Sequence, residues 1–225
     1  MNWTDALEFA RGPLFYAALL VFIGGMVYRL VSVLGLGWSK DRVPVRGSKS
    51  AGVFRTYVKA LLIWPFIPWV KNTFNRNPII YVAGGLFHLG LFAVIFLSAP
   101  HVLVWSSLLG FAWPSLPLPI VDWLAAVAIV GMLVLLVNRI IHPVLRLISG
   151  PAEYLSWLFV FLPMVTGYVM THHLWFSYEM AFTLHMGAVD VLLVWIPLSR
   201  LSHFMFYFFS RTIHGMEFGK RGVQA

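Results

Sequence analysis

The sequence predicts an all-α integral membrane protein, a bundle of five transmembrane helices. Of its 225 residues 60% are hydrophobic and 11% are charged, and the mean hydropathy is +0.83. A soluble domain has about 25% charged residues, so this chain cannot cover a globular surface with polar groups. We therefore exclude a soluble enzyme, a disordered tail and a nucleic-acid-binding module, and expect one membrane domain over residues 1–225.

Five apolar runs are long enough to cross about 30 Å of hydrocarbon. They are 13–37, 79–100, 119–141, 152–171 and 181–205. The first is apolar up to Arg29 near its end, and the third is the most uniformly apolar. Asp5 and Glu8 precede the first run, whereas a secretory signal begins with basic residues, so we expect no cleaved signal peptide.

Basic residues predict how the chain is oriented, because they collect on the cytoplasmic side of a membrane. The segment between the first two runs contains Lys40, Arg42, Arg46, Lys49, Arg55, Lys59, Lys71 and Arg76. We therefore expect the N-terminus outside, the C-terminus in the cytoplasm, and a multi-pass protein of the cell inner membrane. The net charge of +8 then reflects topology and contact with membrane lipid, with no nucleic-acid partner.

Two further segments are expected to lie along the membrane surface. Within the basic cytoplasmic segment 38–78, residues 57–74 are aromatic and broken by two prolines, which favours an interfacial position. A re-entrant sixth segment is the alternative. Residues 102–118 are apolar but interrupted by proline and serine, which is typical of an outer interfacial cap.

The histidines carry the functional hypothesis. The chain has no cysteine, so disulfides, thiolate metal sites and thioether-linked haem are excluded. Histidine at membrane depth is costly and therefore a functional candidate. His88 and His101 belong to the second run or its end, and His185 and His203 to the fifth. The interval from His185 to His203 is five helical turns, which would put both on one face.

Antiparallel runs pair these histidines by depth. His88 pairs with His203 towards the cytoplasm, and His101 pairs with His185 towards the outside. Two such pairs are what two stacked haem b groups need as axial ligands to iron. Pro100 offers a means of aiming His101.

Other roles remain open for several residues. Intramembrane histidines also serve as hydrogen-bonding groups between helices. His172 or His173 is an alternative to His101 as the outer ligand, while His142 and His214 are expected at the surface or facing a partner. Asp190 is a candidate for a hydrogen bond to a histidine or for a proton or quinone role, or else it is a satisfied bundle carboxylate.

Two stretches resemble a known family. FTLHMGAVDVLLVWIPLSRLSHF (182–204) resembles the last helix of the gamma subunit of respiratory nitrate reductase, and GGLFHLGLFAVIFLSAPH (84–101) resembles its second helix. The wider group includes heterodisulfide-reductase-like and sulfite-reductase-associated membrane cytochromes. The interval from His88 to His101 is longer than in nitrate reductase, and the lysine expected near its quinol site is missing, which favours a relative.

The resemblance implies a dihaem cytochrome b that anchors a respiratory oxidoreductase complex in the membrane. Such a subunit has two haem b groups and transfers electrons between quinone or quinol and a cytoplasmic iron–sulfur partner, while terminal catalysis lies on another chain. A haem-free anchor or a transporter-like helical protein is the alternative. A third interpretation keeps the haems but passes electrons to a metal or to oxygen.

Overall fold

The computed structural model describes residues 2–37, 44–63, 67, 74–75 and 77–223. Within these residues the secondary structure is helical, without strands, and five helical stretches are long and apolar enough to cross a membrane. They are Trp3–Gly35, α5 (Pro78–Leu97), α7 (Leu118–Ile141), α9 (Pro151–Thr171) and α10 (Tyr178–Leu198). The predicted all-α, multi-pass membrane class is confirmed.

The first helical stretch begins ten residues earlier than the apolar run at 13. It consists of α1 (Trp3–Phe9), a π-helical turn (Ala10–Leu14) and α2 (Phe15–Gly35). The Asn2 side chain accepts the Asp5 amide at 2.8 Å, and the Asp5 side chain accepts the Asn2 amide. This capping box starts the helix before the hydrocarbon run, and the π-turn accommodates Pro13 within it.

The prediction of one continuous fifth helix over 181–205 is wrong. α10 ends at Leu198, Ser199 is extended at φ −125° and ψ −179°, and a 3₁₀ turn (Arg200–Ser202) leads into α11 (His203–Lys220). The Ser199 hydroxyl accepts the Leu201 amide at 3.2 Å and so supports the new turn. His185 and His203 thus lie on different helices, and the five-turn argument for a shared face does not apply.

The second apolar run is also broken, earlier than the predicted end at residue 100. α5 stops at Leu97, Ser98 has an extended ψ of 140°, and α6 (Ala99–Leu109) follows with Pro100 in its first turn. Proline is favoured there because the first-turn amides have no intrahelical partner. His101 is therefore on α6, separated from His88 by the extended residue Ser98.

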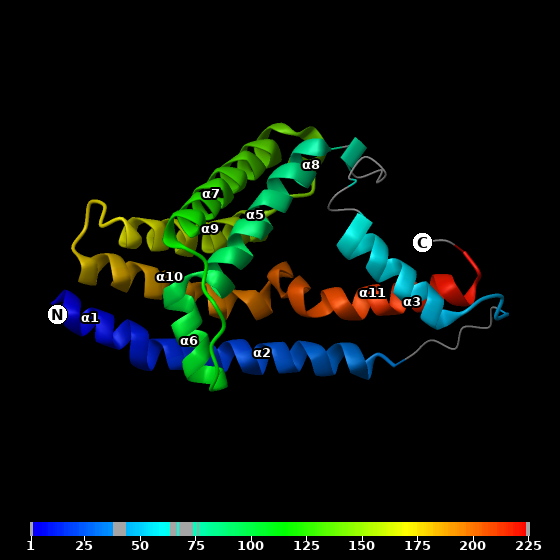
Figure 1. Ribbon diagram of the computed structural model, residues 1–225, viewed down its shortest axis with the longest axis horizontal. Coiled ribbons are helices and arrows are strands. Elements are labelled where there is room, and N and C mark those ends of the chain that lie inside the picture. The colour runs from blue at the N-terminus through cyan, green and yellow to red at the C-terminus, as the bar shows by residue number, and fades with distance from the viewer. Residues whose placement is uncertain (1, 38–43, 64–66, 68–73, 76, 224–225) are drawn as a thin grey trace. The chain divides into compact units, whose positions relative to one another are not determined.

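The chain divides into two compact units. The first contains the described residues of 1–20 and 77–195. In it α5 lies along α7, and α7 contacts α9 (Figure 1). A Cβ at Gly90 would lie 2.6 Å from the Cβ of Ala128, and one at Gly131 would lie 3.0 Å from the carbonyl oxygen of Ala83. Small residues therefore let the α5 and α7 backbones approach closely, as is common in membrane bundles.

The second unit contains the described residues of 21–76 and 196–225. In it α3 (Lys49–Val58) crosses α11 (Figure 1). The crossing depends on glycine, because a Cβ at Gly52 would collide with the carbonyl oxygen of Gly215 and lie 2.5 Å from the Cα of Gly219. The Tyr57 hydroxyl adds hydrogen bonds of 3.0 Å to the Phe208 carbonyl and 2.9 Å to Thr212.

Parts of the predicted surface segments lie outside the described residues. A π-helical turn (Lys59–Ile63) continues α3, but 64–66 and 68–73 are not described, and neither are the basic residues Lys40, Arg42, Lys71 and Arg76. The predicted outer cap at 102–118 consists of most of α6 followed by an irregular stretch.

Candidate functional site

The break at Ser98 determines how His101 is held. A helix leaves its last four carbonyl oxygens without intrahelical donors, and all four at the end of α5 find donors in the residues that follow. The pairs are His101 Nδ1 to Val94 (2.7 Å), Trp105 Nε1 to Ile95 (2.9 Å), Trp113 Nε1 to Phe96, and the Leu116 amide to Leu97 (2.8 Å). Because a carbonyl can only accept, Nδ1 of His101 carries the proton and the lone pair is on Nε2.

Residues of α9 hold His185 in the same tautomer as His101. Its Nδ1 lies 3.1 Å from the carbonyl oxygen of Pro163 and 3.3 Å from the Thr166 hydroxyl. The residue is buried at 8% exposure. A Cβ at Gly167 would be 3.0 Å from Cε1 of the ring, so only glycine leaves room for it there. The lone pair of His185 is therefore also on Nε2.

The rings of His101 and His185 are close neighbours within the first unit. Their centroids are 6.3 Å apart and their planes differ by 29°. An imidazole nitrogen binds a metal ion at about 2 Å, and adding the ring radius on each side puts the centres of two opposed ligands about 6 Å apart. The separation therefore fits two histidines that would hold one metal centre between them through Nε2.

His88 and His203 share the backbone pairing of the other two candidates. Nδ1 of His88 lies 2.7 Å from the Gly84 carbonyl, and Nδ1 of His203 lies 3.1 Å from the Arg200 carbonyl. A carbonyl at Nδ1 places a proton on that nitrogen of each ring, the tautomer found in histidines that bind metal through Nε2. His88 belongs to the first unit and His203 to the second, so their pairing stays a prediction.

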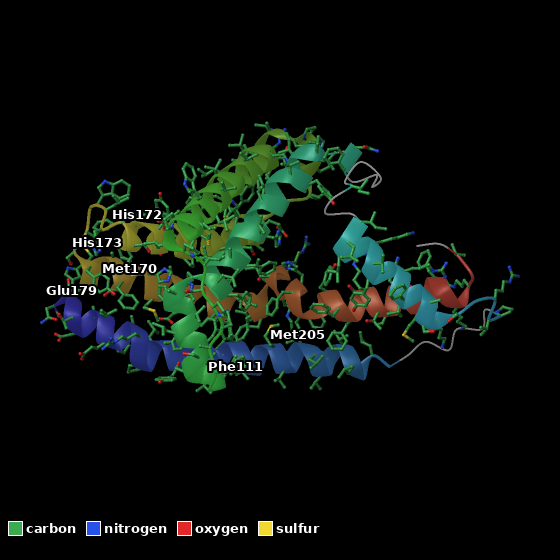
Figure 2. The ribbon with its side chains drawn as sticks, in the orientation of Figure 1. Phe111, Met170, His172, His173, Glu179 and Met205 are labelled. Atoms are coloured by element: carbon green, nitrogen blue, oxygen red, sulfur yellow. The ribbon has the colours of Figure 1, made fainter. Side chains whose placement is uncertain are left out.

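The alternative outer ligands are engaged elsewhere. His172 and His173 lie at the turn between α9 and α10, which also has Glu179 near it (Figure 2). Nε2 of His172 lies 3.6 Å from Asp122, and the His173 ring lies 6.0 Å from the Tyr178 ring. The geometry favours His101 over both as the residue opposite His185.

The remaining two histidines have different surroundings. Nδ1 of His142 accepts the Leu145 amide at 3.5 Å and caps α8 (Pro143–Leu147), which puts the proton on Nε2. The His214 ring lies 4.3 Å from the Phe218 ring on α11. Neither shows the Nδ1-to-carbonyl contact that the four candidates share.

Asp190 is a buried carboxylate whose two oxygens are left unsatisfied by the described residues. It lies on α10 at 3% exposure, and neither of its oxygens has a hydrogen-bond donor among the described residues. His185, five residues earlier, uses its Nδ1 on α9 instead. An unpaired carboxylate in this setting is costly and marks a functional candidate.

Several residues around the site were not predicted from sequence. Pro163, Thr166 and Gly167 hold His185, and Val94 and Ser98 hold His101. Only Ser98 left a sequence signal, since it stands before the alanine and proline that begin α6. In the part of the chain that the structure describes, no three His, Asp or Glu side chains are grouped to bind one metal ion.

Comparison with known proteins gives a relative that covers nearly the whole chain. No family model matches the chain, and no solved structure is significantly similar to it. A protein of Nitratidesulfovibrio vulgaris (strain Hildenborough), whose name states no activity, is 30% identical over 216 residues, which are 95% of this chain and 94% of the relative. The chain belongs to the same family as this Nitratidesulfovibrio vulgaris protein.

Proposed function

We propose that the chain is a dihaem cytochrome b, the membrane subunit of a respiratory oxidoreductase complex. In this role it transfers electrons between the quinone pool and a cytoplasmic iron–sulfur partner. The observation that supports the proposal is the His101–His185 pair, with ring centroids 6.3 Å apart and both Nδ1 atoms on backbone carbonyls. A histidine that served merely to join helices would not need a second histidine at this distance.

The ligand set follows from the same chemistry. His101 and His185 would hold the outer haem through Nε2, and His88 and His203 the cytoplasmic one. Bound haem would supply one-electron transfer. The carbonyl bonds at Nδ1 fix the orientation of each ring and increase its basicity as a ligand. Gly167 gives the His185 ring the room to keep that orientation.

Asp190 would take part in proton transfer, and exposed basic residues on the predicted cytoplasmic side would attract the partner or lipid. Quinol oxidation near the outer haem releases protons, and a buried carboxylate without a hydrogen-bond partner among the described residues is suited to accept one. With the C-terminus in the cytoplasm, Arg46, Lys49 and Arg55 would face that side, and all three are exposed. They would attract an acidic partner surface or anionic lipid in the cell inner membrane.

The experiment is a dithionite-reduced minus oxidised visible spectrum of the purified protein, with haem quantified per chain. We expect about two haem b in the wild type and about one in either His101→Ala or His185→Ala. The double variant should also keep about one, because both residues would hold the same haem. His142→Ala is the matched control and should keep two, since that Nδ1 accepts a backbone amide.

Two outcomes would contradict the proposal. A folded wild type, made with ample haem supply, that is colourless would leave a haem-free anchor or transporter-like protein. A double His101/His185 variant that loses both haems, while each single variant loses one, would show that the two residues hold different groups. His88→Ala combined with His185→Ala should, by contrast, remove both.

A further inference from the structure

Arg29 is a cation near the end of the first membrane-spanning stretch, and its charge is not neutralised by the described residues. Its Nε donates to the carbonyl of Pro197, and its Nη1 donates to the Ser202 hydroxyl at 3.1 Å. Both acceptors are uncharged. No carboxylate among the described residues forms an ion pair with it. An arginine at membrane depth without a counter-charge among the described residues is expensive, and a bound anion would lower that cost.

The surrounding fold is built to hold this side chain. A Cβ at Gly25 would lie 2.6 Å from the Cβ of Pro197, so glycine lets α2 approach the end of α10 within the second unit. One turn later, Arg29 reaches the Pro197 carbonyl, which lacks an intrahelical donor because α10 ends at the next residue. Residues far apart in sequence thus hold the guanidinium at Nε and at Nη1.

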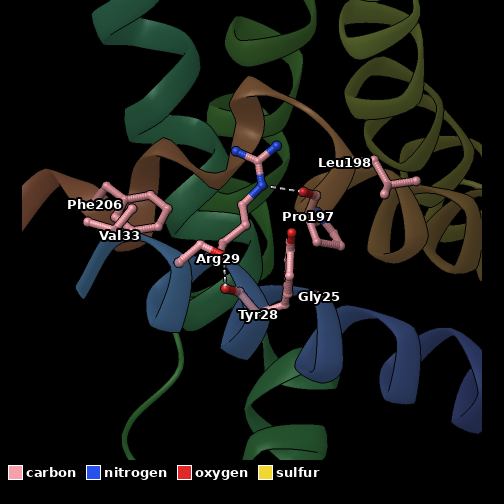
Figure 3. Close-up of a pocket in the computed structure, with 8 residues that line it drawn as sticks. Gly25, Tyr28, Arg29, Val33, Pro197, Leu198 and Phe206 are labelled. Carbon is pink, nitrogen blue, oxygen red and sulfur yellow. Dashed lines mark hydrogen bonds between the residues drawn. The ribbon is translucent and has the colours of Figure 1, made fainter. Parts of the chain in front are cut away.

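Arg29 also lines a cavity. A cavity of about 460 Å³ is lined by Arg29 together with Tyr28, Ser32, Pro197 and Phe206, among others. Figure 3 shows the guanidinium reaching from α2 with both terminal nitrogens directed away from that helix. Two of its five N–H groups are used by Pro197 and Ser202, which leaves three. The remaining N–H groups are on Nη1 and Nη2, and a fork of two such nitrogens matches the two oxygens of a carboxylate or phosphate.

We propose that the Arg29 cavity binds an oxyanion, and that this oxyanion is a propionate carboxylate of the haem held by His203. The inference rests on the proposed function. Its link to that haem is the chain itself, because Ser202, which bonds Arg29, directly precedes His203. A lipid phosphate shares the oxyanion chemistry and is the other source that the experiment distinguishes.

The test is a spectroelectrochemical titration of both haems in the detergent-purified full chain. Arg29→Gln should lower the reduction equilibrium of one haem about tenfold, which is about 59 mV for one electron, and leave the other unchanged. The reason is that loss of a nearby positive charge makes the iron harder to reduce. Arg29→Lys should shift the same haem less, and Ser202→Ala should shift it in the same direction by a smaller amount.

Arg139→Gln is the matched control. Its Nη1 donates to the Ser149 hydroxyl at 2.7 Å, the same kind of contact in the first unit, and both potentials should stay as in the wild type. The unchanged second haem of Arg29→Gln shows that the variant is folded. Bound phospholipid is measured in parallel as phosphorus per chain.

The outcomes separate this inference from the proposed function. A wild type with two haems and an Arg29→Gln variant with unshifted potentials would overturn the propionate site and leave the cytochrome in place. Loss of about one phospholipid per chain with unshifted potentials would overturn it in favour of a lipid phosphate. A wild type without haem would overturn both.

Discussion

The His185 ring on α10 occupies the space that a side chain at Gly167 on α9 would need. A Cβ at Gly167 would lie 3.0 Å from Cε1 and 3.2 Å from Nδ1 of the ring, closer than the ring can accept without moving. The same ring is held at Nδ1 by Pro163, one turn earlier on α9. Position 167 therefore controls where Nε2 of His185 points.

Gly167→Ala should displace the His185 ring and weaken the outer haem site. We expect haem content to fall from about two towards one per chain, measured by the reduced-minus-oxidised spectrum. Gly24→Ala is the control, because a Cβ there meets no described atom within 4 Å. An alanine at 167 with two haems and an unchanged spectrum would contradict the ligand role of His185.

Asp190→Asn should leave both haems in place and slow their reduction by a quinol analogue about tenfold or more, because an amide cannot take up the proton that quinol releases. Stability should not fall, since burying an unpaired carboxylate costs more than burying an amide. The measurements are stopped-flow haem reduction and thermal unfolding in detergent. Glu179 is an exposed carboxylate on the same helix, and the haems of Glu179→Gln should be reduced at the wild-type rate. Haem reduction at the wild-type rate in Asp190→Asn would contradict the proton role of Asp190.

Gly52→Ala should loosen the crossing of α3 and α11. The added methyl collides with the Gly215 carbonyl, and such overpacking costs about 1–3 kcal/mol. Limited proteolysis should then cut the segment between α2 and α5 faster than in the wild type. Gly35→Ala, where a Cβ meets no described atom within 4 Å, should be cut at the wild-type rate. An unchanged rate for Gly52→Ala would show that the crossing is not needed in the protein as it exists.

Single cysteines should report the predicted orientation cleanly, because the natural chain has none. We expect a membrane-impermeant maleimide to label Thr4→Cys and Phe111→Cys from outside in intact cells. Val223→Cys should react only after the membrane is opened. Each position is exposed, so its reactivity reports its side of the membrane. Labelling of Val223→Cys in intact cells would reverse the topology.

The sequence predicts the number and approximate places of the spans well, because hydrocarbon selects apolar residues over a fixed length. It predicts their ends poorly where a local bond decides them. Asn2 and Asp5 extend the first helix before its apolar run, and Ser98 and Ser199 end helices inside apolar runs. A serine in an apolar run has little effect on hydropathy, although its hydroxyl and extended backbone redirect the chain.

The sequence alone determined the membrane class, the histidines available as ligands and the absence of thiolates. These follow from composition and residue type. Tertiary structure decided which atoms meet: that His101 lies 6.3 Å from His185, and that Arg29 reaches the end of α10. The physical reason is that the positions of His101 and Arg29 depend on carbonyl oxygens freed where α5 and α10 end. Which backbone groups are free, and which side chains reach them, is settled only when distant segments pack together.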